Sequence, residues 1–392
     1  MSDQISKYLQ ERIDAGDFPS AVYLVAEKGE IVLHEALGHA VVEPERIDAR
    51  PDTIYDLASL TKVLVTGLLA VKLVEMEQLD LNQIVEHYMP YLIEFEPYPL
   101  ETDQDCLDTL ISELASHHSA YPAWRPFYLL PDEHKGSRRE NILWTIANRI
   151  PIQLEPEVIY SDLNFIMLGG VVEKLYGESL DRITKREICG ALDLRDTFFN
   201  PPDDRKHRIA ASEKGNAFEK QTCIEQGYLS PNPKNPVATA PGSDPFRTQT
   251  IWGEVHDGNA YFMGGVAGHA GLFSTAEEVF KIAQQFLPDY TTLLKPETCE
   301  LFRTNFTKGM NEDRSFAFQL ASTKDSTAGN KMSPESFGHL GFTGTSLWID
   351  PVKERIFILL TNRTHNHALP FVNINSVRRR FHDIAIDLLE KN

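Results

Sequence analysis

The segments with strand-like patterns lie at the two ends of this 392-residue chain, and helical patterns fill the middle. Near the N-terminus, residues 20–26 and 30–34 are apolar and are separated by a turn at Gly29, which predicts a pair of strands. Near the C-terminus, residues 338–348 and 355–361 have the same character. Because both ends carry residues that favour strands, we expect one sheet built from both termini of the chain.

Helical patterns account for most of the rest of the chain. Apolar residues recur at helical spacing in five segments, which are residues 4–15, 59–77, 161–176, 276–287 and 372–389. Two further segments, residues 80–145 and 200–250, are rich in proline. The first predicts short helices and loops, and the second predicts a long irregular excursion at the surface.

These patterns together predict a mixed α/β fold of the α+β kind. We expect an antiparallel sheet flanked by the N- and C-terminal helices, with a mainly helical insertion beside it. The chain is then expected to be a single two-lobed unit. The α/β lobe is expected over about residues 1–64 and 241–392, and the helical lobe over about residues 65–240. A site is expected in the cleft between the lobes.

Charge and composition exclude some classes of partner. The chain is 42% hydrophobic and 24% charged, with a formal net charge of −19, which argues against nucleic acid and anionic membranes as partners. No apolar run reaches the roughly eighteen residues of a membrane span, and the N-terminus lacks the order of a signal peptide. The four cysteines form no C-x-x-C pair. We therefore expect a reduced cytoplasmic protein without disulfides, and its oligomeric state stays open.

The tetrad Ser59-Leu60-Thr61-Lys62 stands where a polar turn gives way to an apolar helix. Positions i and i+3 share a helix face, so Ser59 Oγ and Lys62 Nζ are expected to meet in the first turn, beside free N–H groups. A lysine whose pKa is depressed by burial and a cationic neighbourhood can be the base that makes a serine nucleophilic. The alternative is that the spacing of the serine and the lysine arises by chance. Ser59 would then be a polar residue at the start of a helix, and Lys62 a charged residue at the surface.

A second segment of chemical interest opens the helix predicted over residues 161–176. Its tyrosine, Tyr160, has a phenolic oxygen that could shuttle a proton between a nucleophile and a leaving group. The alternative is an aromatic anchor beside a helix N-cap, supplied by Ser161 or Asp162.

A third segment is a strand pattern over residues 337–348 that glycines interrupt at positions 338, 341 and 344. Glycines inside a strand indicate a bulge or a close approach of the backbone to a ligand. A strand edge beside the helix that starts at Ser59 could offer an N–H group to an oxyanion.

The histidine motifs do not predict a metal centre. His34 and His39 are five positions apart in a strand-like segment, whereas the helical zinc motif needs histidines four apart. The histidine pairs at 117–118 and 365–367 lack a third ligand. His269, in a glycine-rich block, is interpreted as a hydrogen-bonded structural residue. The chain also lacks G-x-S-x-G, a P-loop and a strand–G-x-G-x-x-G–helix unit, so we expect no metal and no cofactor.

The ordered motifs resemble those of the serine beta-lactamase and penicillin-binding-protein superfamily. An S-x-x-K at 59–62 is followed by Tyr-x-Asp at 160–162 and by His-x-Gly at 339–341. The chain most resembles the branch of class C beta-lactamase-like proteins, with its related esterases and D-aminopeptidases. The glycine-rich block over residues 264–275 resembles that branch too, and the resemblance spans nearly the whole chain.

The resemblance implies a role for each matching position. It makes Ser59 the acylated nucleophile, Lys62 its base or proton partner, and Tyr160 a second proton shuttle. It makes the backbone N–H groups of Ser59 and Phe342 the oxyanion hole, and Gly341 the end of the strand motif.

Two positions depart from the pattern of the family. Asp162 stands where lactamases usually have asparagine, so a hydrogen-bond donor is lost and a negative charge is gained. His339 stands where they have lysine, so a permanent cation is replaced by a group that titrates near neutral pH. Both changes weaken a site meant for the carboxylate of a penicillin or of a peptide terminus.

We therefore expect a serine hydrolase that forms an acyl-enzyme on Ser59 and cleaves a small ester or amide, in the manner of an esterase or a D-amino-acid peptide or amide hydrolase. Two alternatives stay open. One is a true beta-lactamase or DD-peptidase, with a beta-lactam or peptide substrate. The other is a penicillin-binding sensor that keeps the fold without turnover. The joint presence of Ser59, Lys62 and Tyr160 favours the enzyme.

Overall fold

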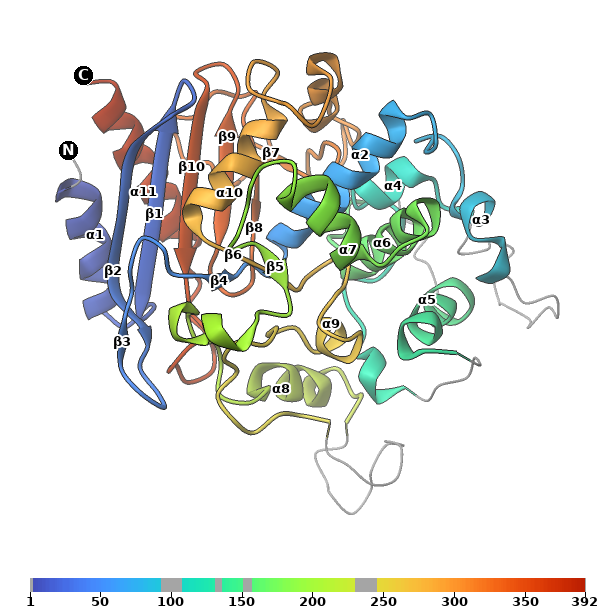
Figure 1. Ribbon diagram of the computed structural model, residues 1–392, viewed down its shortest axis with the longest axis horizontal. Helices are drawn as coiled ribbons and strands as arrows, with labels where there is room; N and C mark the ends of the chain where they lie inside the picture. The colour runs from blue at the N-terminus through green and yellow to red at the C-terminus, as the bar shows by residue number, and fades with distance from the viewer. Residues whose placement is uncertain (1–2, 93–107, 131–135, 151–156, 230–244, 392) are drawn as a thin grey trace.

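A seven-stranded antiparallel sheet made from both ends of the chain forms one side of the molecule (Figure 1). The computed structural model describes residues 3–92, 108–130, 136–150, 157–229 and 245–391. The strands, in spatial order, are β3 (Ile47–Asp48), β2 (Glu30–Val41), β1 (Ser20–Glu27), β10 (Arg355–Thr361), β9 (Ser346–Asp350), β8 (Phe337–Leu340) and β7 (Gln319–Leu320). The two chain ends meet where β1 pairs with β10, with Tyr23 opposite Leu359. The predicted antiparallel sheet is confirmed.

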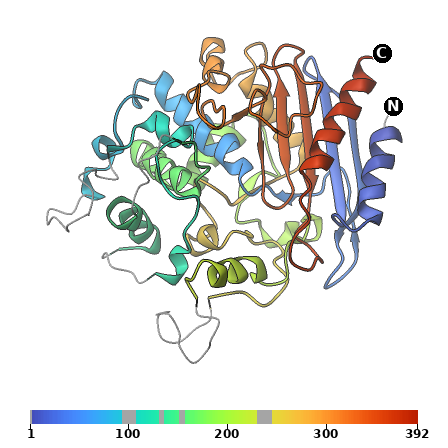
Figure 2. The ribbon, with the colours of Figure 1, turned by 180° about the vertical axis from the view of Figure 1, so that it is seen from behind.

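The two faces of this sheet pack against different layers. Side chains alternate along a strand, so Tyr23 and Val25 of β1 point into one apolar cluster, whereas Val22 and Leu24 point into the other. The first cluster lies under α1 (Asp3–Asp14) and α11 (Asn375–Leu389), which run side by side on the outer face (Figure 2). These are the N- and C-terminal helices that the sequence predicted to flank the sheet.

The other face of the sheet carries α10 (Ala276–Ala283), and a mainly helical part of the chain lies beyond it (Figure 1). Its α-helices are α2 (Leu68–Glu75), α3 (Val85–Tyr88), α4 (Ile111–Ala115), α5 (Arg138–Arg149), α6 (Asp162–Tyr176), α7 (Leu180–Thr184), α8 (Ala217–Glu225) and α9 (Gly258–Phe262). A second, three-stranded sheet joins β4 (Tyr55–Asp56), β6 (Leu272–Ser274) and β5 (Phe198–Phe199). The predicted mixed α/β architecture is confirmed.

Three local expectations differ from the structure. The helix predicted over residues 59–77 is not uniform, because Lys62–Gly67 form a π-helical stretch before α2 begins; π-bulges are frequent at functional sites. The strand pattern over residues 338–348 is a hairpin of β8 and β9, because Gly344 turns the chain with a φ of 111°. The irregular segment 200–250 contains α8, and its residues 230–244 lie outside the described residues.

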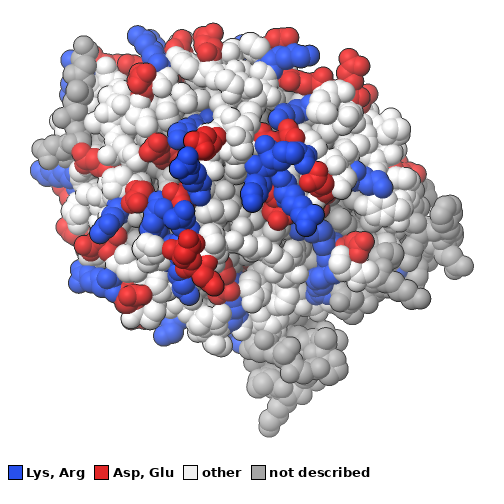
Figure 3. Space-filling view, viewed as in Figure 1, with Lys and Arg blue, Asp and Glu red and all other residues white. Residues whose placement is uncertain are grey.

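The described cysteines are reduced, and charges of both signs are distributed over the surface. Cys189, Cys223 and Cys299 are free and buried, while Cys106 lies outside the described residues. Basic and acidic side chains are interspersed over the face shown in Figure 3. Within the part of the chain that the structure describes, no helix is long and apolar enough to cross a membrane.

Candidate active site

The turn that carries Ser59 is held from two sides. β4, just before the turn, pairs with β6. The hydroxyls of Thr343 and Thr345, in the turn between β8 and β9, donate hydrogen bonds to backbone carbonyl oxygens of the segment before Ser59, at 2.7 and 3.0 Å. Ala58 then adopts a φ of 47°, in a region that L residues seldom occupy and that is common at functional sites. These tertiary contacts therefore hold Ser59 at the N-terminal end of the helical segment.

Gly341 allows the end of β8 to approach this turn closely. A Cβ at Gly341 would lie 2.0 Å from Thr345 Oγ1 and 2.5 Å from the carbonyl oxygen of Leu57, and the second contact is with backbone that cannot rotate away. Gly341 is therefore a point of close approach, but the group it approaches is the chain's own backbone, where the sequence interpretation expected a ligand or a bulge.

Replacing Gly341 by alanine is expected to lower the free energy of unfolding by about 1–3 kcal/mol, the usual cost of forcing extra atoms into a packed region. It is also expected to displace Phe342 from the cavity wall. Urea unfolding of the variant measures the first effect. Gly190→Ala is the matched control, because its Cβ comes no nearer than 3.2 Å to any atom outside the glycine and its two chain neighbours. A Gly341→Ala protein as stable as the wild type would contradict the close approach.

Ser59, Lys62 and Asp162 form a continuous hydrogen-bonded chain. The ammonium of Lys62 donates to Ser59 Oγ at 2.9 Å and to Asp162 Oδ1 at 2.7 Å. It also donates to the carbonyl oxygen of His269 at 3.1 Å. Lys62 is fully buried, so the surface-charge alternative for this residue is wrong, and the i, i+3 meeting predicted from the sequence is confirmed.

The charge state of Lys62 differs from the sequence expectation. Burial works to lower the pKa of Lys62, but the Asp162 carboxylate and the neighbouring Tyr160 outweigh burial and raise this pKa above its ordinary value. The expected depressed pKa is therefore wrong, because the sequence reasoning assumed a cationic neighbourhood where the fold supplies a carboxylate. At neutral pH the resting lysine is an ammonium.

Tyr160 and Asp162 are positioned by the start of α6. Ser161 is the N-cap, and its hydroxyl accepts the N–H of Leu163 at 3.2 Å. Ser161 is therefore the predicted N-cap, and the residues on either side of it, Tyr160 and Asp162, line the cavity. The ring of Tyr160 lies against the ring of His117, with centroids 4.5 Å apart. The Lys62 nitrogen lies 5.1 Å from the centre of the Tyr160 ring.

His339 is a buried, neutral group in this structure. Its Nδ1–H donates to the carbonyl oxygen of Leu340 at 2.9 Å, and its Nε2 has no partner among the described residues. Burial, together with the positive charges of Lys62 and Arg314, lowers the pKa of His339 well below its usual value. The expectation that it titrates near neutral pH is therefore wrong, because it ignored desolvation.

These residues surround one cavity of about 520 Å³. Six of the predicted site residues line it: Ser59, Tyr160, Asp162, His339, Gly341 and Phe342. Lys62 reaches Ser59 from beneath the cavity wall. Across the described residues, no hydrogen bond uses the backbone N–H of Ser59 or of Phe342, so both donors stay available.

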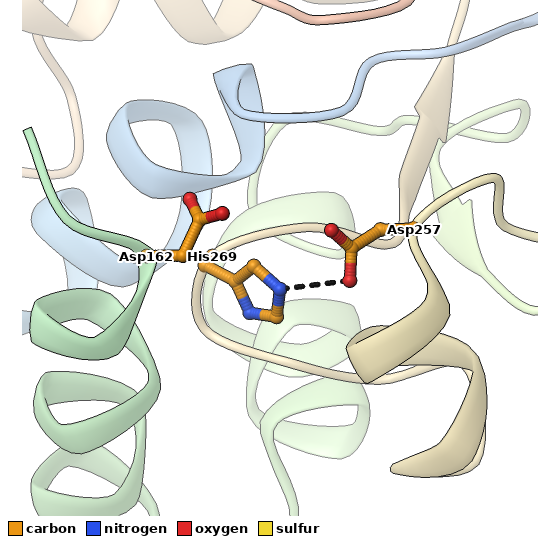
Figure 4. Close-up of side chains that lie close together, drawn as sticks. All are labelled: Asp162, Asp257 and His269. Atoms are coloured by element: carbon orange, nitrogen blue, oxygen red, sulfur yellow. Dashed lines mark hydrogen bonds and ion pairs between the residues drawn. The ribbon is translucent and has the colours of Figure 1, made fainter. Parts of the chain in front are cut away.

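Asp257 lines the same cavity and is paired with His269 behind it. The imidazole of His269 donates from Nε2 to Asp257 Oδ1 at 2.9 Å, and Figure 4 shows the Asp257 carboxylate turned toward His269 and Asp162. Burial raises the pKa of Asp257, but His269 outweighs it and leaves this pKa below the ordinary value. The partner of His269 is therefore this carboxylate, where the sequence predicted a structural role.

Asp162, Asp257 and His269 also form the group that could in principle hold a cation in the described part of the chain, with ligand atoms within 4.8 Å of one another. The Lys62 ammonium already supplies a positive charge to Asp162. His269 donates from Nε2 to Asp257 Oδ1, so this nitrogen has no lone pair to offer a metal. Each of the two carboxylates therefore already has a partner, Lys62 for Asp162 and His269 for Asp257.

The sequence analysis missed several residues of the cavity. Arg314, Arg363 and Arg378 line it, and Asp257 and Glu219 face it from the other segments. Asp257 lies in the V-H-D-G-N-A stretch just before the glycine-rich block, which offered a signal by resemblance alone. The arginines carried no sequence signal, because Arg378 sits in a basic run that resembles a solvated helix face.

Comparisons with known proteins agree with this fold. The Beta-lactamase family matches residues 5–378, and the chain belongs to that family. The protein named "Putative D-alanyl-D-alanine carboxypeptidase" of Escherichia coli (strain K12) is 31% identical over 386 residues, which cover 93% of this chain and 82% of the relative. The family places the chain among hydrolases of the serine beta-lactamase and penicillin-binding-protein type.

Solved structures with the same fold include a hydrolase and a class C beta-lactamase. EstCE1, a hydrolase with promiscuous acyltransferase activity, has a TM-score of 0.70 at 19% identity and covers 97% of this chain and 98% of its own. A class C beta-lactamase from Rhodobacter sphaeroides has a TM-score of 0.65 at 18% identity, covering 99% of this chain and 100% of its own. At these identities the likeness is one of fold.

Proposed function

We propose that this chain is a serine hydrolase that cleaves a small ester or amide through an acyl-enzyme on Ser59. The observation that carries the proposal is the 2.9 Å hydrogen bond between Lys62 Nζ and Ser59 Oγ at the wall of a 520 Å³ cavity. A penicillin-binding sensor would have no need of a buried lysine beside the serine, since burial of a charge is costly unless it serves a purpose.

The reaction follows from the positions of these groups. Ser59 Oγ attacks the carbonyl carbon, and its proton passes to the deprotonated form of Lys62, with Tyr160 beside the transfer. The free N–H groups of Ser59 and Phe342 donate hydrogen bonds to the developing oxyanion. The proton then goes to the departing alcohol or amine, which leaves an ester on Ser59. Water attacks this ester in the same way and releases the acid.

Hydrolysis of p-nitrophenyl butyrate by wild type and by Ser59→Ala tests the proposal. We expect the variant to lose at least about a thousandfold in kcat/KM, because no other group replaces the nucleophile. Mass spectrometry of the protein trapped with a fluorophosphonate should find the adduct on the peptide that contains Ser59. Equal rates in the two proteins, or an unlabelled wild type, would refute the acyl-enzyme.

Carboxypeptidase activity is a second candidate, favoured by Arg314. Its side chain is 5% exposed, and its Nε and Nη1 have no hydrogen-bond partner in the described ranges. Its Nη2 is paired with Glu312 at 2.9 Å, and a substrate carboxylate that accepts from Nη1 would add a charge-assisted hydrogen bond. The cavity thus offers a guanidinium although position 339 has no lysine. Release of D-alanine from an N-acylated D-alanyl-D-alanine peptide, absent in Arg314→Gln, would support this activity.

A further inference from the structure

His256 contacts both of the segments that supply the proposed oxyanion donors. Its ring stacks on the ring of Phe342, with centroids 5.4 Å apart and an angle of 24° between the planes. Its backbone N–H donates to Asp56 Oδ2 at 2.7 Å, and Asp56 Oδ1 accepts the N–H of Ala58 at 2.9 Å. Ala58 immediately precedes Ser59. One residue therefore connects the segment of Phe342 to the turn of Ser59.

Glu213 holds the ring of His256 and the backbone of a second aromatic residue. The Nε2–H of His256 donates to Glu213 Oε2 at 2.8 Å, and the N–H of Phe218 donates to Glu213 Oε1, also at 2.8 Å. The ring of Phe218 lies against that of Phe342, with centroids 4.7 Å apart. A single carboxylate therefore positions two of the rings that pack against Phe342.

The two carboxylates that hold His256 lie behind the cavity wall. His256 and Phe342 line the cavity, whereas Glu213 and Asp56 do not, and these two acids are 3% and 6% exposed. Burial of a carboxylate is costly unless hydrogen bonds replace the lost water. Among the described residues, both oxygens of each carboxylate accept from the groups named above. Their common effect is to hold His256 in place.

Hydrogen bonds restrain the backbone on either side of the Phe342 N–H. The N–H of Gly341 donates to the carbonyl oxygen of Thr345 at 2.8 Å, and the carbonyl oxygen of Phe342 accepts from Arg363 Nε at 2.7 Å. The Phe342 N–H itself makes no hydrogen bond to any described residue. An oxyanion donor acts over a narrow range of distances, so the packing of the Phe342 ring against His256 completes its restraint.

We propose that His256 is a positioning residue, which holds the Phe342 N–H at the distance from Ser59 that an oxyanion requires. The proposal rests on the proposed serine-hydrolase function and adds a residue to its machinery. His256 acts through Phe342 and Asp56, without exchanging a proton with the substrate. Loss of its ring would leave a space beside Phe342, and a displaced donor stabilises the transition state less well.

His256→Ala tests this role in the steady-state hydrolysis of p-nitrophenyl butyrate. We expect kcat to fall about tenfold or more while KM stays within about twofold, because the displaced donor acts on the transition state and not on the bound ester. Urea unfolding shows whether the variant is folded under the assay conditions. An unchanged kcat in the folded variant, or a rise in KM without a fall in kcat, would overturn the proposal.

Inhibition by butylboronic acid reports on the oxyanion hole separately from turnover. Ser59 Oγ adds to the boron atom and gives up its proton, which leaves a negatively charged tetrahedral boronate with one oxygen at the oxyanion position. The inhibition constant should rise in His256→Ala by about the factor by which kcat falls, since both depend on the same donors. A slower variant that binds the boronic acid as tightly as the wild type would contradict the positioning role.

A double variant separates positioning from proton transfer. In Glu213→Gln/His256→Phe, glutamine keeps an oxygen for the N–H of Phe218, and a phenyl ring that cannot carry a proton stacks on Phe342. We expect its kcat to recover to within about threefold of the wild type, because the aromatic contact is kept. If the folded double variant is as slow as His256→Ala, the imidazole itself is needed and the proposal is wrong. Should His256→Ala not fold, the double variant decides alone.

His382→Ala is the matched control. His382 is also buried among aromatic rings, with that of Phe381 5.3 Å away, and its Nδ1–H donates to the carbonyl oxygen of Thr327 at 2.9 Å. It belongs to α11 and does not line the cavity. Its loss should lower the stability of the protein while kcat and the inhibition constant of butylboronic acid stay unchanged.

The two proposals fail in different ways. If p-nitrophenyl butyrate hydrolysis survives Ser59→Ala, the acyl-enzyme is wrong, whatever His256→Ala gives. If hydrolysis is lost in Ser59→Ala but folded His256→Ala keeps the wild-type kcat and inhibition constant, the serine hydrolase stands and the positioning role of His256 falls.

Discussion

Lys62→Met is expected to lower kcat/KM for p-nitrophenyl butyrate by roughly a thousandfold, the usual contribution of a positioned base. Lys62 is the group that hydrogen-bonds Ser59 Oγ, at 2.9 Å. The change is also expected to cost roughly 2 kcal/mol of unfolding free energy, because Asp162 loses its partner. The cost stays below that of a fully buried pair, since the Asp162 side chain is 18% exposed. Steady-state kinetics and urea unfolding measure the two effects.

Lys72→Met is the matched control for this prediction. Lys72 follows Lys62 in the same helical segment and pairs with Glu187 at 2.8 Å, but it does not line the cavity. Its loss should leave kcat/KM unchanged and cost less than about 1 kcal/mol, as for other partly exposed pairs. The proposed base would be wrong if Lys62→Met kept more than about a tenth of the wild-type kcat/KM, given the usual size of such effects.

Asp162→Asn is expected to move the rise of kcat/KM with pH toward lower pH. Asp162 is the largest contributor to the raised pKa of Lys62, so removing its charge lowers that pKa and releases the base at a lower pH. The variant should therefore reach a larger share of its maximal rate at pH 7 than the wild type does. The measurement is kcat/KM for p-nitrophenyl butyrate across the neutral and alkaline range.

The same pair makes a prediction for stability. Because the folded pKa of Lys62 lies above its unfolded value of about 10.4, the stabilisation is complete below that pH and is lost as pH rises through the folded pKa. The stability difference between wild type and Asp162→Asn should thus shrink at strongly alkaline pH. Glu187→Gln, which breaks the Lys72 pair, is the control for the pH profile. If Asp162→Asn does not shift the dependence of kcat/KM on pH, deprotonation of Lys62 does not determine that dependence.

Local sequence patterns were sufficient for much of the fold. The apolar runs of β1 and β10 and the helical spacing in α6 are local patterns, and Gly177 ends α6 in the left-handed conformation with a φ of 70°. The hairpin of β8 and β9 was harder to predict, because apolar residues run through both strands and only the glycines between them signal the turn. The division into lobes at about residues 64 and 241 stays a prediction.

The candidate site, like the fold, could be predicted from the sequence only in part. Ser59 and Lys62 could be paired from the sequence, since three positions along a helix fix their meeting. Their chemical state could not, because the groups that decide it are remote in sequence: Asp162 is 100 positions from Lys62, and His269 is 207. A pKa depends on every charge within a few ångströms and on burial, and neither is a local property.

The sequence by itself determined the order of motifs, the sheet from both termini and the serine–lysine pair, because these rest on periodicity and short-range spacing. Tertiary structure alone decided that Lys62 is a charged ammonium, that His339 is a neutral imidazole, and that Arg314 and Asp257 line one cavity. Desolvation and through-space electrostatics set these properties, and both arise only when segments far apart in the chain pack together.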